Sequence, residues 1–174
     1  MSMNALYILC GIPFSGKSTL AKRLVKRLGF KRVDLDKIKI KLLGGDIRDE
    51  SITQESWDKV YDHMYKEIED YLRQGENVVQ DAGNYTIYER SLVKEIADRL
   101  GIETITIFVD VDEIIARERW LKNKKTLKRF DVSKQLFNEA IVEMQPPPKD
   151  EHTLVYDGES DIQVWIDEHL ITEE

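Results

Sequence analysis

Short runs of apolar residues alternate along the chain with longer segments in which apolar residues recur every three or four positions. A short continuous apolar run is typical of a strand buried in a parallel sheet, whereas the longer recurrence is typical of a helix with one buried face. The pattern predicts strands over residues 5–10, 30–33, 77–80, 104–109 and 153–156. It predicts helices over residues 20–28, 35–42, 56–73, 92–100, 112–120, 136–144 and 162–170.

This alternation predicts an α/β fold. Strands that alternate with helices form a parallel sheet through right-handed crossovers. We therefore expect residues 1–174 to form a single three-layer α/β/α domain with a central parallel sheet of about five strands. Ligands of such sheets bind beyond the carboxyl ends of the strands. The strand ends at Cys10, Val33, Gln80 and Val109 should therefore gather around one site.

The segment from Gly11 to Ser18 reads Gly-Ile-Pro-Phe-Ser-Gly-Lys-Ser and fits the phosphate-binding P-loop pattern, Gly, four residues, Gly-Lys-Ser/Thr. A predicted strand precedes it and a predicted helix follows, which is the context that the motif requires. The loop N–H groups and the helix N-terminus can then converge on phosphate oxygens. We expect Lys17 to reach the β- and γ-phosphates of ATP and Ser18 to bind Mg²⁺. The other nucleotide-binding candidates in the loop are Gly11, Pro13, Phe14, Ser15, Gly16 and Thr19.

Three aspartates stand at the predicted strand ends, namely Asp34, Asp36 and Asp81. Phosphoryl transfer depends on charge neutralisation and in-line positioning rather than on covalent help from the protein. Asp81 follows the strand over 77–80 and is the candidate to hold Mg²⁺ with Ser18. Asp36 is the candidate to accept the proton of an attacking hydroxyl, with Asp34 as the alternative. Either of these two could instead cap the helix that starts there.

Aromatic residues such as Trp57 and Tyr61 recur along the predicted helix over 56–73. Such a row could serve as a surface on which bases stack. Helical spacing favours packing into the core, and we expect that role for these rings.

Composition limits the partners of the chain. With 41% hydrophobic residues, 34% charged residues and a net charge of −7, bulk electrostatic adhesion to nucleic acid or membrane is disfavoured. No apolar run is long enough to span a membrane, the N-terminus lacks the pattern of a signal peptide, and the lone Cys10 cannot form an internal disulfide. We expect a cytoplasmic protein. His63, His152 and His169 lack ligand spacing, so Mg²⁺ with ATP is the only metal expected.

Basic residues concentrate in one segment. Between Arg117 and Lys134 there are eight basic and two acidic residues. We expect residues 117–134 to form a short basic lid over the nucleotide, with an irregular stretch over 122–128. A solvated basic surface is the alternative. The candidates for contact with the phosphates are Arg117, Arg119, Lys122, Lys125 and Arg129.

Taken together, these motifs resemble the small P-loop kinases grouped with polynucleotide 5′-hydroxyl kinase, zeta toxin and chloramphenicol phosphotransferase. The resemblance rests on the P-loop, on Asp36 to Lys39 where the family has Asp-x-x-Arg, on Gly75 to Asn84, which is similar to Gly-x-x-Val-Val-x-Asp-x-x-Asn, and on Asp112–Arg119 and Met144–Pro147 around the basic segment. It implies an ATP- and Mg²⁺-dependent kinase in which Lys17, Asp36, Lys39 and Arg117 are catalytic. It further implies that Asp36, Lys39, Asp81 and Asn84 lie near the acceptor and that Arg117 and Arg119 lie near the nucleotide.

The sequence leaves the acceptor open. We expect transfer of the γ-phosphate of Mg-ATP to a hydroxyl of a small molecule. A nucleic-acid 5′-hydroxyl end is the alternative; the basic segment favours it, whereas the acidic remainder of the chain counts against it. Lys39 also counts against a nucleic-acid end, because a lysine cannot bind a phosphate through the bidentate hydrogen bonds that an arginine makes. A third reading is an ATP-binding switch or ATPase without a hydroxyl acceptor. The string Asn123 to Thr126 lacks the aspartate of a guanine-reading Asn-Lys-x-Asp, and no Gly-x-Gly-x-x-Gly follows a strand, which excludes a dinucleotide dehydrogenase.

Overall fold

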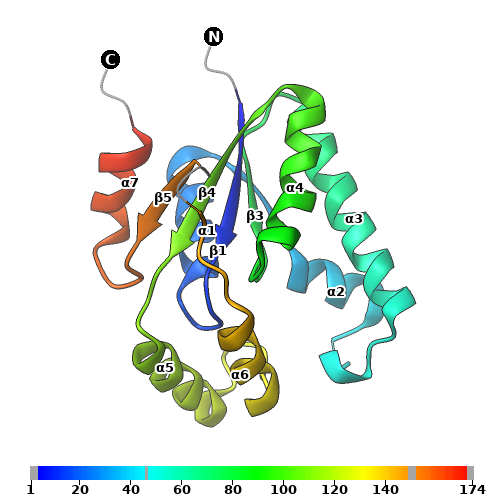
Figure 1. The fold of residues 1–174 in the computed structure, drawn as a ribbon, viewed down its shortest axis with the longest axis vertical. Coiled ribbons are helices and arrows are strands. Elements are labelled where there is room, and N and C mark those ends of the chain that lie inside the picture. Colours follow the sequence, from blue (N-terminus) through cyan, green and yellow to red (C-terminus); the bar gives the residue numbers. More distant parts are fainter. Residues whose placement is uncertain (1–3, 46, 149–151, 172–174) are drawn as a thin grey trace.

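A five-stranded parallel sheet forms the centre of the computed structural model, which describes residues 4–45, 47–148 and 152–171 (Figure 1). The strands are β1 (Ala5–Cys10), β2 (Lys31–Asp34), β3 (Val78–Asp81), β4 (Glu103–Val109) and β5 (Thr153–Tyr156). Their spatial order is β2-β3-β1-β4-β5, and each neighbouring pair is parallel. The predicted α/β class with about five parallel strands is confirmed.

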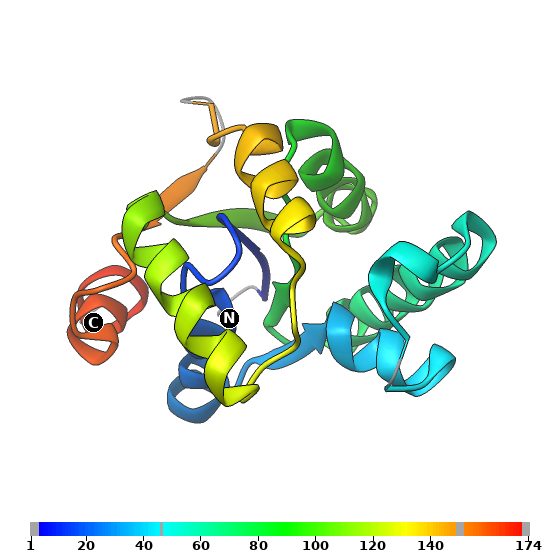
Figure 2. The same ribbon diagram turned by 90° about the horizontal axis from the view of Figure 1, so that it is seen from below.

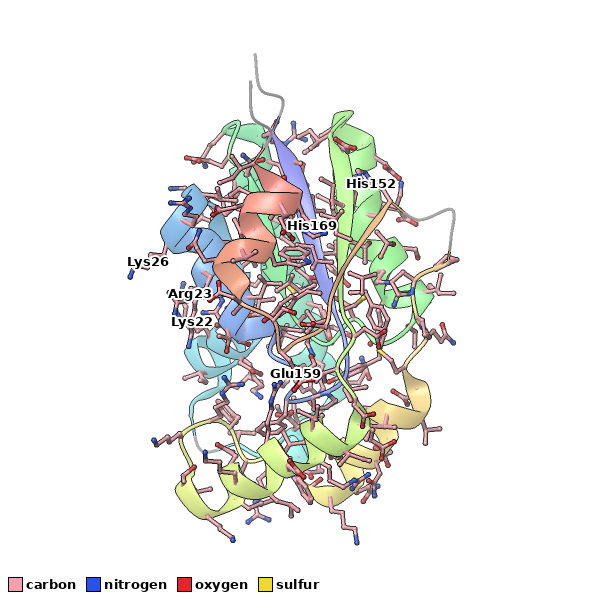
Figure 3. The ribbon with its side chains drawn as sticks, turned by 90° about the vertical axis from the view of Figure 1, so that its left-hand side faces the viewer. Lys22, Arg23, Lys26, His152, Glu159 and His169 are labelled. Carbon is pink, nitrogen blue, oxygen red and sulfur yellow. The ribbon has the colours of Figure 1, made fainter. Side chains whose placement is uncertain are left out.

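Helices cover both faces of the sheet. They are α1 (Lys17–Leu28), α2 (Leu35–Leu43), α3 (Gln54–Arg73), α4 (Ile87–Leu100), α5 (Glu113–Thr126), α6 (Lys134–Glu143) and α7 (Ile162–Leu170), with a short 3₁₀ helix at Asp49–Ser51. Helices α3 and α4 lie on one face, and α1 and α7 on the other (Figure 1). Figure 3 shows Lys22, Arg23 and Lys26 on the outer side of α1, away from the sheet. Asp46, between α2 and α3 in the chain, lies outside the described residues.

Successive residues of the strands are buried on opposite faces. Leu6 and Ile8 of β1 pack with α3 and α4, whereas Leu9 packs with α1 and α7. In β3, Val78 and Val79 are both fully buried, one in each core. A sheet covered on both faces needs apolar side chains at successive positions, and this explains the continuous apolar runs in the sequence.

The turn after β1 requires glycine. Gly11 has a φ of 151°, and a Cβ atom there would lie 2.6 Å from the carbonyl oxygen of Val109 at the end of β4. A side chain would therefore push the P-loop away from the neighbouring strand. This close approach places the start of the loop over the carboxyl ends of the two central strands.

Helices α5 and α6 and the loop between them form a unit beyond the carboxyl ends of the strands (Figures 1 and 2). The unit has a small core of Val111, Ala116, Trp120 and Phe137. The prediction of an irregular stretch over 122–128 is wrong for its first part, because α5 continues to Thr126. Lysine is a good helix former, and its charge stays in solvent. We call residues 113–143 the α5–α6 segment.

Two further findings concern membrane spans and metal ligands. No helix in the described part of the chain is long and apolar enough to cross a membrane. His152 precedes β5 and His169 lies in α7, on different elements (Figure 3). Among the described residues, no group of three or more His, Cys, Asp and Glu side chains is arranged to hold a metal ion.

Candidate active site

The P-loop joins the carboxyl end of β1 to the start of α1. Gly16 is the N-cap of α1, with a φ of 113°, and no side chain caps this end of the helix. The first N–H groups of α1 can therefore bind an anion placed above the loop. Lys17 folds back over the loop, and its Nζ donates to the carbonyl oxygens of Gly11 (2.5 Å) and Ile12 (2.9 Å). Burial lowers the pKa of Lys17 from 10.5 to about 8, against the opposing effect of the nearby Asp81 carboxylate.

Ser18 and Asp81 meet below the loop. The Ser18 hydroxyl donates to Asp81 Oδ1 over 3.2 Å. Asp81 is the last residue of β3 and stands beside Asp34, the last residue of β2, because the two are paired in parallel register. The fold thus brings together Ser18 and Asp81, which are 63 positions apart in the chain.

Arg32 joins the two carboxylates at these strand ends. Its Nη2 lies 2.5 Å from Asp81 Oδ2 and 2.7 Å from Asp34 Oδ2, and its Nε donates to Asp81 Oδ2 over 2.9 Å. All three side chains are nearly buried. Sequence reasoning missed Arg32. The available signal was its spacing, because residues two apart on a strand share a face and Arg32 therefore lies on the same face of β2 as Asp34.

Asp34 and Asp36 have different environments. Asp34 caps α2 by accepting from the backbone N–H of Lys37 over 3.2 Å, so the capping alternative holds for this residue. The Asp36 side chain is 62% exposed and lies 3.4 Å from Lys39 Nζ. Although solvent reaches the carboxylate, the protein atoms around it remove part of its hydration, and this desolvation raises the pKa of Asp36. The positive charge of Lys39 lowers this pKa, whereas the negative charges of Asp34 and Asp49 raise it further. Of the two aspartates, Asp36 has the carboxylate that is open to a ligand.

Lys39 is buried and already paired. Its Nζ lies 2.7 Å from Asp49 Oδ1 and 4.3 Å from the centre of the Phe130 ring, which belongs to the loop of the α5–α6 segment. The centre of the Trp57 ring, which belongs to α3, lies 5.8 Å from Lys39 Nζ. Lys39 therefore connects α2 with the α5–α6 segment across the mouth of the site.

Two cavities meet at the P-loop. The first, of about 400 Å³, is lined by Phe14, Gly16, Thr19, Arg119, Lys122, Asn123, Thr126, Lys128, Arg129, Tyr156, Gly158 and Ile162. The second, of about 490 Å³, includes Lys17, Ser18, Arg32, Asp34, Asp36, Lys39, Asp81 and Asn84 in its lining. Phe14 and Arg129 line both. Of the predicted loop residues, all but Gly11 and Ser15 line these cavities, and the three predicted aspartates line the second one.

The basic residues of the α5–α6 segment divide into two sets. Arg119 Nη1 donates to the carbonyl oxygens of Phe14 (3.2 Å) and Ser15 (2.9 Å), and Arg129 Nη2 donates to Thr19 Oγ1 (3.0 Å). Lys122 lines the first cavity. Arg117 instead pairs with Glu113 over 2.7 Å and lies over the Phe137 ring, and neither it nor Lys125 is among the lining residues of the two cavities.

Asn84 is held within the protein. Its Nδ2 donates to the carbonyl oxygen of Leu9 (2.6 Å) and to Gln80 Oε1 (2.5 Å), and the residue is 6% exposed. These bonds attach the loop after β3 to the end of β1. The geometry favours a positioning role for Asn84 over a direct contact with an acceptor.

Aromatic rings form a wall of the second cavity. Trp57, Tyr61 and Tyr65 are one helical turn apart on α3, with ring centres 6.0 and 6.1 Å apart, and Tyr85 and Phe130 complete the wall. The expectation of core packing is correct only in part. The α3 rings touch the core at their edges and are half-buried, because α3 extends beyond the sheet and its first turns have no strand to cover them.

Gly83 permits the position of Tyr85. A Cβ atom on Gly83 would lie 2.6 Å from the Tyr85 ring. With glycine there, the ring lies against the loop and 5.9 Å from Lys17 Nζ. The backbone N–H of Gln145 donates to the carbonyl oxygen of Tyr85 over 2.8 Å, so the end of the α5–α6 segment is attached to the same loop.

Comparison with known proteins agrees with this geometry. Residues 6–147 match the family AAA_33, described as an AAA domain. Comparison with curated proteins gives no match. Among solved structures, a candidate kinase from Chloroflexus aurantiacus has a TM-score of 0.76 at 20% identity, over 98% of this chain and 97% of that one.

Two further structures share the fold. Kti12 of Chaetomium thermophilum, solved with ADP-AlF3, has a TM-score of 0.72 at 16% identity, over 94% of this chain and 96% of that one. A gluconokinase from Sinorhizobium meliloti has a TM-score of 0.65 at 18% identity, over 97% and 90%. At these identities the likeness concerns the fold, and the family match covers most of the chain. The chain belongs to the AAA domain family AAA_33, and its fold is that of the small P-loop kinases.

Proposed function

We propose that this protein is an ATP-dependent kinase that transfers the γ-phosphate to a hydroxyl group of a small molecule. The observation that carries the proposal is the pair of cavities that meet at the P-loop, with Asp36 facing the second one. A nucleotide in the first cavity would direct its phosphates across the loop toward the second. An acceptor in the second cavity would then face the terminal phosphate.

The first cavity fits the base and ribose of a nucleotide. It opens beside Gly16 and Thr19 at the start of α1, where phosphates would bind, and continues between Arg119 and Tyr156. Its volume of about 400 Å³ lies in the usual range of small-molecule sites. The Kti12 structure, with a similar fold, holds ADP-AlF3, which supports a nucleotide in this fold.

Ser18 and Asp81 fit Mg²⁺. A hydroxyl and a carboxylate oxygen 3.2 Å apart beside a phosphate site are the kind of ligands that this ion takes, with phosphate oxygens and water completing its shell. Bound there with the nucleotide, Mg²⁺ would neutralise charge on the phosphates. For Mg²⁺ to bind Asp81, the ion pair between Arg32 and Asp81 would have to break at least in part.

In the proposed reaction, the acceptor oxygen forms a bond to the γ-phosphorus while the bond from that phosphorus to the β–γ bridging oxygen breaks. ADP leaves with the electron pair of the broken bond, and the hydroxyl proton passes to Asp36. Lys17, which lies against the P-loop, and Arg129, which lines both cavities, would offset negative charge that spreads over the transferring group. Asp36 gives up its proton to solvent after product release.

Transfer of labelled γ-phosphate tests the proposal. The acceptors are a library of small-molecule alcohols and a set of 5′-hydroxyl oligonucleotides, each with Mg-ATP. We expect label on a small molecule, and about 100-fold or more slower transfer by Asp36→Asn with unchanged ADP affinity, whereas Lys17→Ala loses turnover with the fold intact. Label on the oligonucleotides would identify a nucleic-acid end kinase, and label only in free phosphate would favour an ATPase.

The pH dependence of kcat tests the role of Asp36 as the base. A base must be deprotonated, so activity is present above its pKa and is lost as the pH falls through it. Burial already places this pKa above its ordinary 3.8, and Lys39 holds it down. We therefore expect Lys39→Met to move the acidic limb of the profile to higher pH. Lys41→Met, on the exposed side of the same helix, should leave the limb in place. An unmoved limb in Lys39→Met would contradict the role.

Proton uptake tests the contact between Lys17 and phosphate. In the free protein Lys17 loses its proton as the pH rises through about 8. Phosphate oxygens would restore its ordinary pKa, so Lys17 should contribute the uptake of most of one proton when ADP binds at about pH 9 and none at about pH 6. Calorimetry in buffers of different ionisation enthalpy measures the uptake. Lys17→Met should abolish it and Lys26→Met, on the outer side of α1, should keep it; equal uptake by both variants would refute the contact.

Arg32 forms an ion pair with Asp81, the predicted Mg²⁺ ligand, and would compete with the ion for this carboxylate. Arg32→Met leaves the nearly buried Asp34 and Asp81 carboxylates without their cation and should lower the free energy of unfolding by about 3 kcal/mol. Mg²⁺ alone should then raise the melting temperature of the variant more than that of the wild type. The control is Arg27→Met, whose Asp167 partner is exposed and whose loss should cost about 1 kcal/mol or less. Equal effects of Mg²⁺ on wild type and Arg32→Met would exclude competition at Asp81.

A further inference from the structure

The second cavity carries more negative than positive charge. Eight carboxylates and five cationic side chains line it. Two of the cations are already neutralised by carboxylates of the same cavity, because Arg32 pairs with Asp34 and Asp81, and Lys39 pairs with Asp49 and Asp36. A third cation, Lys17, lies against the P-loop, where the γ-phosphate would bind.

The surplus charge belongs to one end of the cavity. Glu89 of α4 and Glu139 and Glu143 of α6 have no cationic partner within 4 Å in the described ranges 4–45, 47–148 and 152–171. The backbone bond between Gln145 and Tyr85 holds the end of α6 against the start of α4 and so brings these carboxylates to the same side. Glu89 is fixed by its capping bonds to Thr86.

Aromatic rings occupy the same end. Tyr61, Tyr65 and Tyr85 line the cavity and are half-buried. Burial, followed by the Glu89 carboxylate, raises the pKa of Tyr61 to about 12 and also raises the pKa of Tyr65 and Tyr85. Tyr85 stands four positions before Glu89 at the start of α4, and Tyr61 and Tyr65 line the same cavity as this carboxylate. Ring faces and carboxylates both attract a cation.

We propose that the acceptor of this kinase is a ring-bearing alcohol that also carries a protonated amine. Its ring would pack against Tyr61, Tyr65 and Tyr85, its amine would face Glu89 and Glu143, and its hydroxyl would face Asp36. An anionic or phosphorylated acceptor at this end would meet Glu89, Glu139 and Glu143, and like-charge repulsion disfavours it there. The remaining cations of the lining, Lys22 and Arg129, come from α1 and from the loop between α5 and α6. This inference rests on the proposed function, since it assigns a substrate class to the same cavity.

Three probes that differ in one group separate charge from shape. They are 2-amino-1-phenylethanol, 1-phenylethane-1,2-diol and mandelate, which share a ring and a hydroxyl and carry a cation, no charge and an anion respectively. Their affinities are measured by calorimetry with Mg-ADP present, independently of transfer. We expect the amine to bind about tenfold more tightly than the diol, and mandelate to bind more weakly still. The aliphatic 1-amino-2-propanol should lose affinity because it lacks the ring.

Substitutions test which residues cause the preference for the amine over the diol. Glu143→Gln and Glu89→Gln should each reduce the ratio of amine to diol affinity about threefold or more, since each removes one negative charge. The matched control is Glu95→Gln, an exposed carboxylate of α4 outside the cavity lining, which should leave the ratio unchanged. Tyr65→Leu should weaken binding of the three ring-bearing probes more than binding of 1-amino-2-propanol, which has no ring to pack against Tyr65. Thermal unfolding of each variant excludes loss of the fold.

The outcomes separate this inference from the proposed function. Preference for the amine that falls in Glu143→Gln supports the inference, whether or not phosphate is transferred, and absence of transfer in that case would count against the kinase. Equal or tighter binding of mandelate overturns the inference, as does an unchanged ratio in both glutamine variants or no binding of any probe at about 10 mM. Phosphate transfer to the diol or to mandelate in those cases would leave the kinase proposal standing.

Discussion

The ion pairs of Arg32 with Asp34 and Asp81 hold together the part of the molecule on which the site depends. Parallel register puts these two carboxylates side by side at the ends of β2 and β3, where they would repel each other strongly in a poorly solvated position. The guanidinium between them removes that repulsion. Its planar shape lets it serve two carboxylates at once, which the point charge of a lysine does less well. Arg32 thereby offsets the charge of both carboxylates.

The same arrangement distributes charge along the two cavities. Cationic groups, Lys17, Arg119 and Arg129, lie near the P-loop and the first cavity, where phosphates would bind. The cations farther into the second cavity are neutralised by their neighbours, and carboxylates and aromatic rings remain. The polarity therefore changes from cationic to anionic in the direction in which a phosphoryl group would move. A net charge of −7 for the whole chain says little about this local separation.

The α5–α6 segment closes both cavities on one side through a few contacts. Arg119 and Arg129 attach it to the P-loop and the start of α1, Phe130 packs on Lys39, and Gln145 attaches its end to the loop after β3. Of these contacts, only the one between Gln145 and Tyr85 joins two backbone groups. The segment is thus connected to each cavity by side chains that line it.

The sequence by itself determined the α/β class, the parallel sheet and the P-loop, because these follow from local patterns: apolar runs buried on two faces, helical periodicity and glycine at a turn that admits no side chain. The sequence also indicated that Ser18, Asp36 and Asp81 would lie close together, since the P-loop and the strand ends of a parallel sheet meet at one edge, and all three line the second cavity. The tertiary structure alone decided what depends on contacts between distant segments. Examples are Arg32 as the partner of Asp81, Arg119 and Arg129 rather than Arg117 beside the P-loop, and the α3 rings as a cavity wall. Helical spacing shows that a face is apolar, but what covers that face is set by elements far away in the chain.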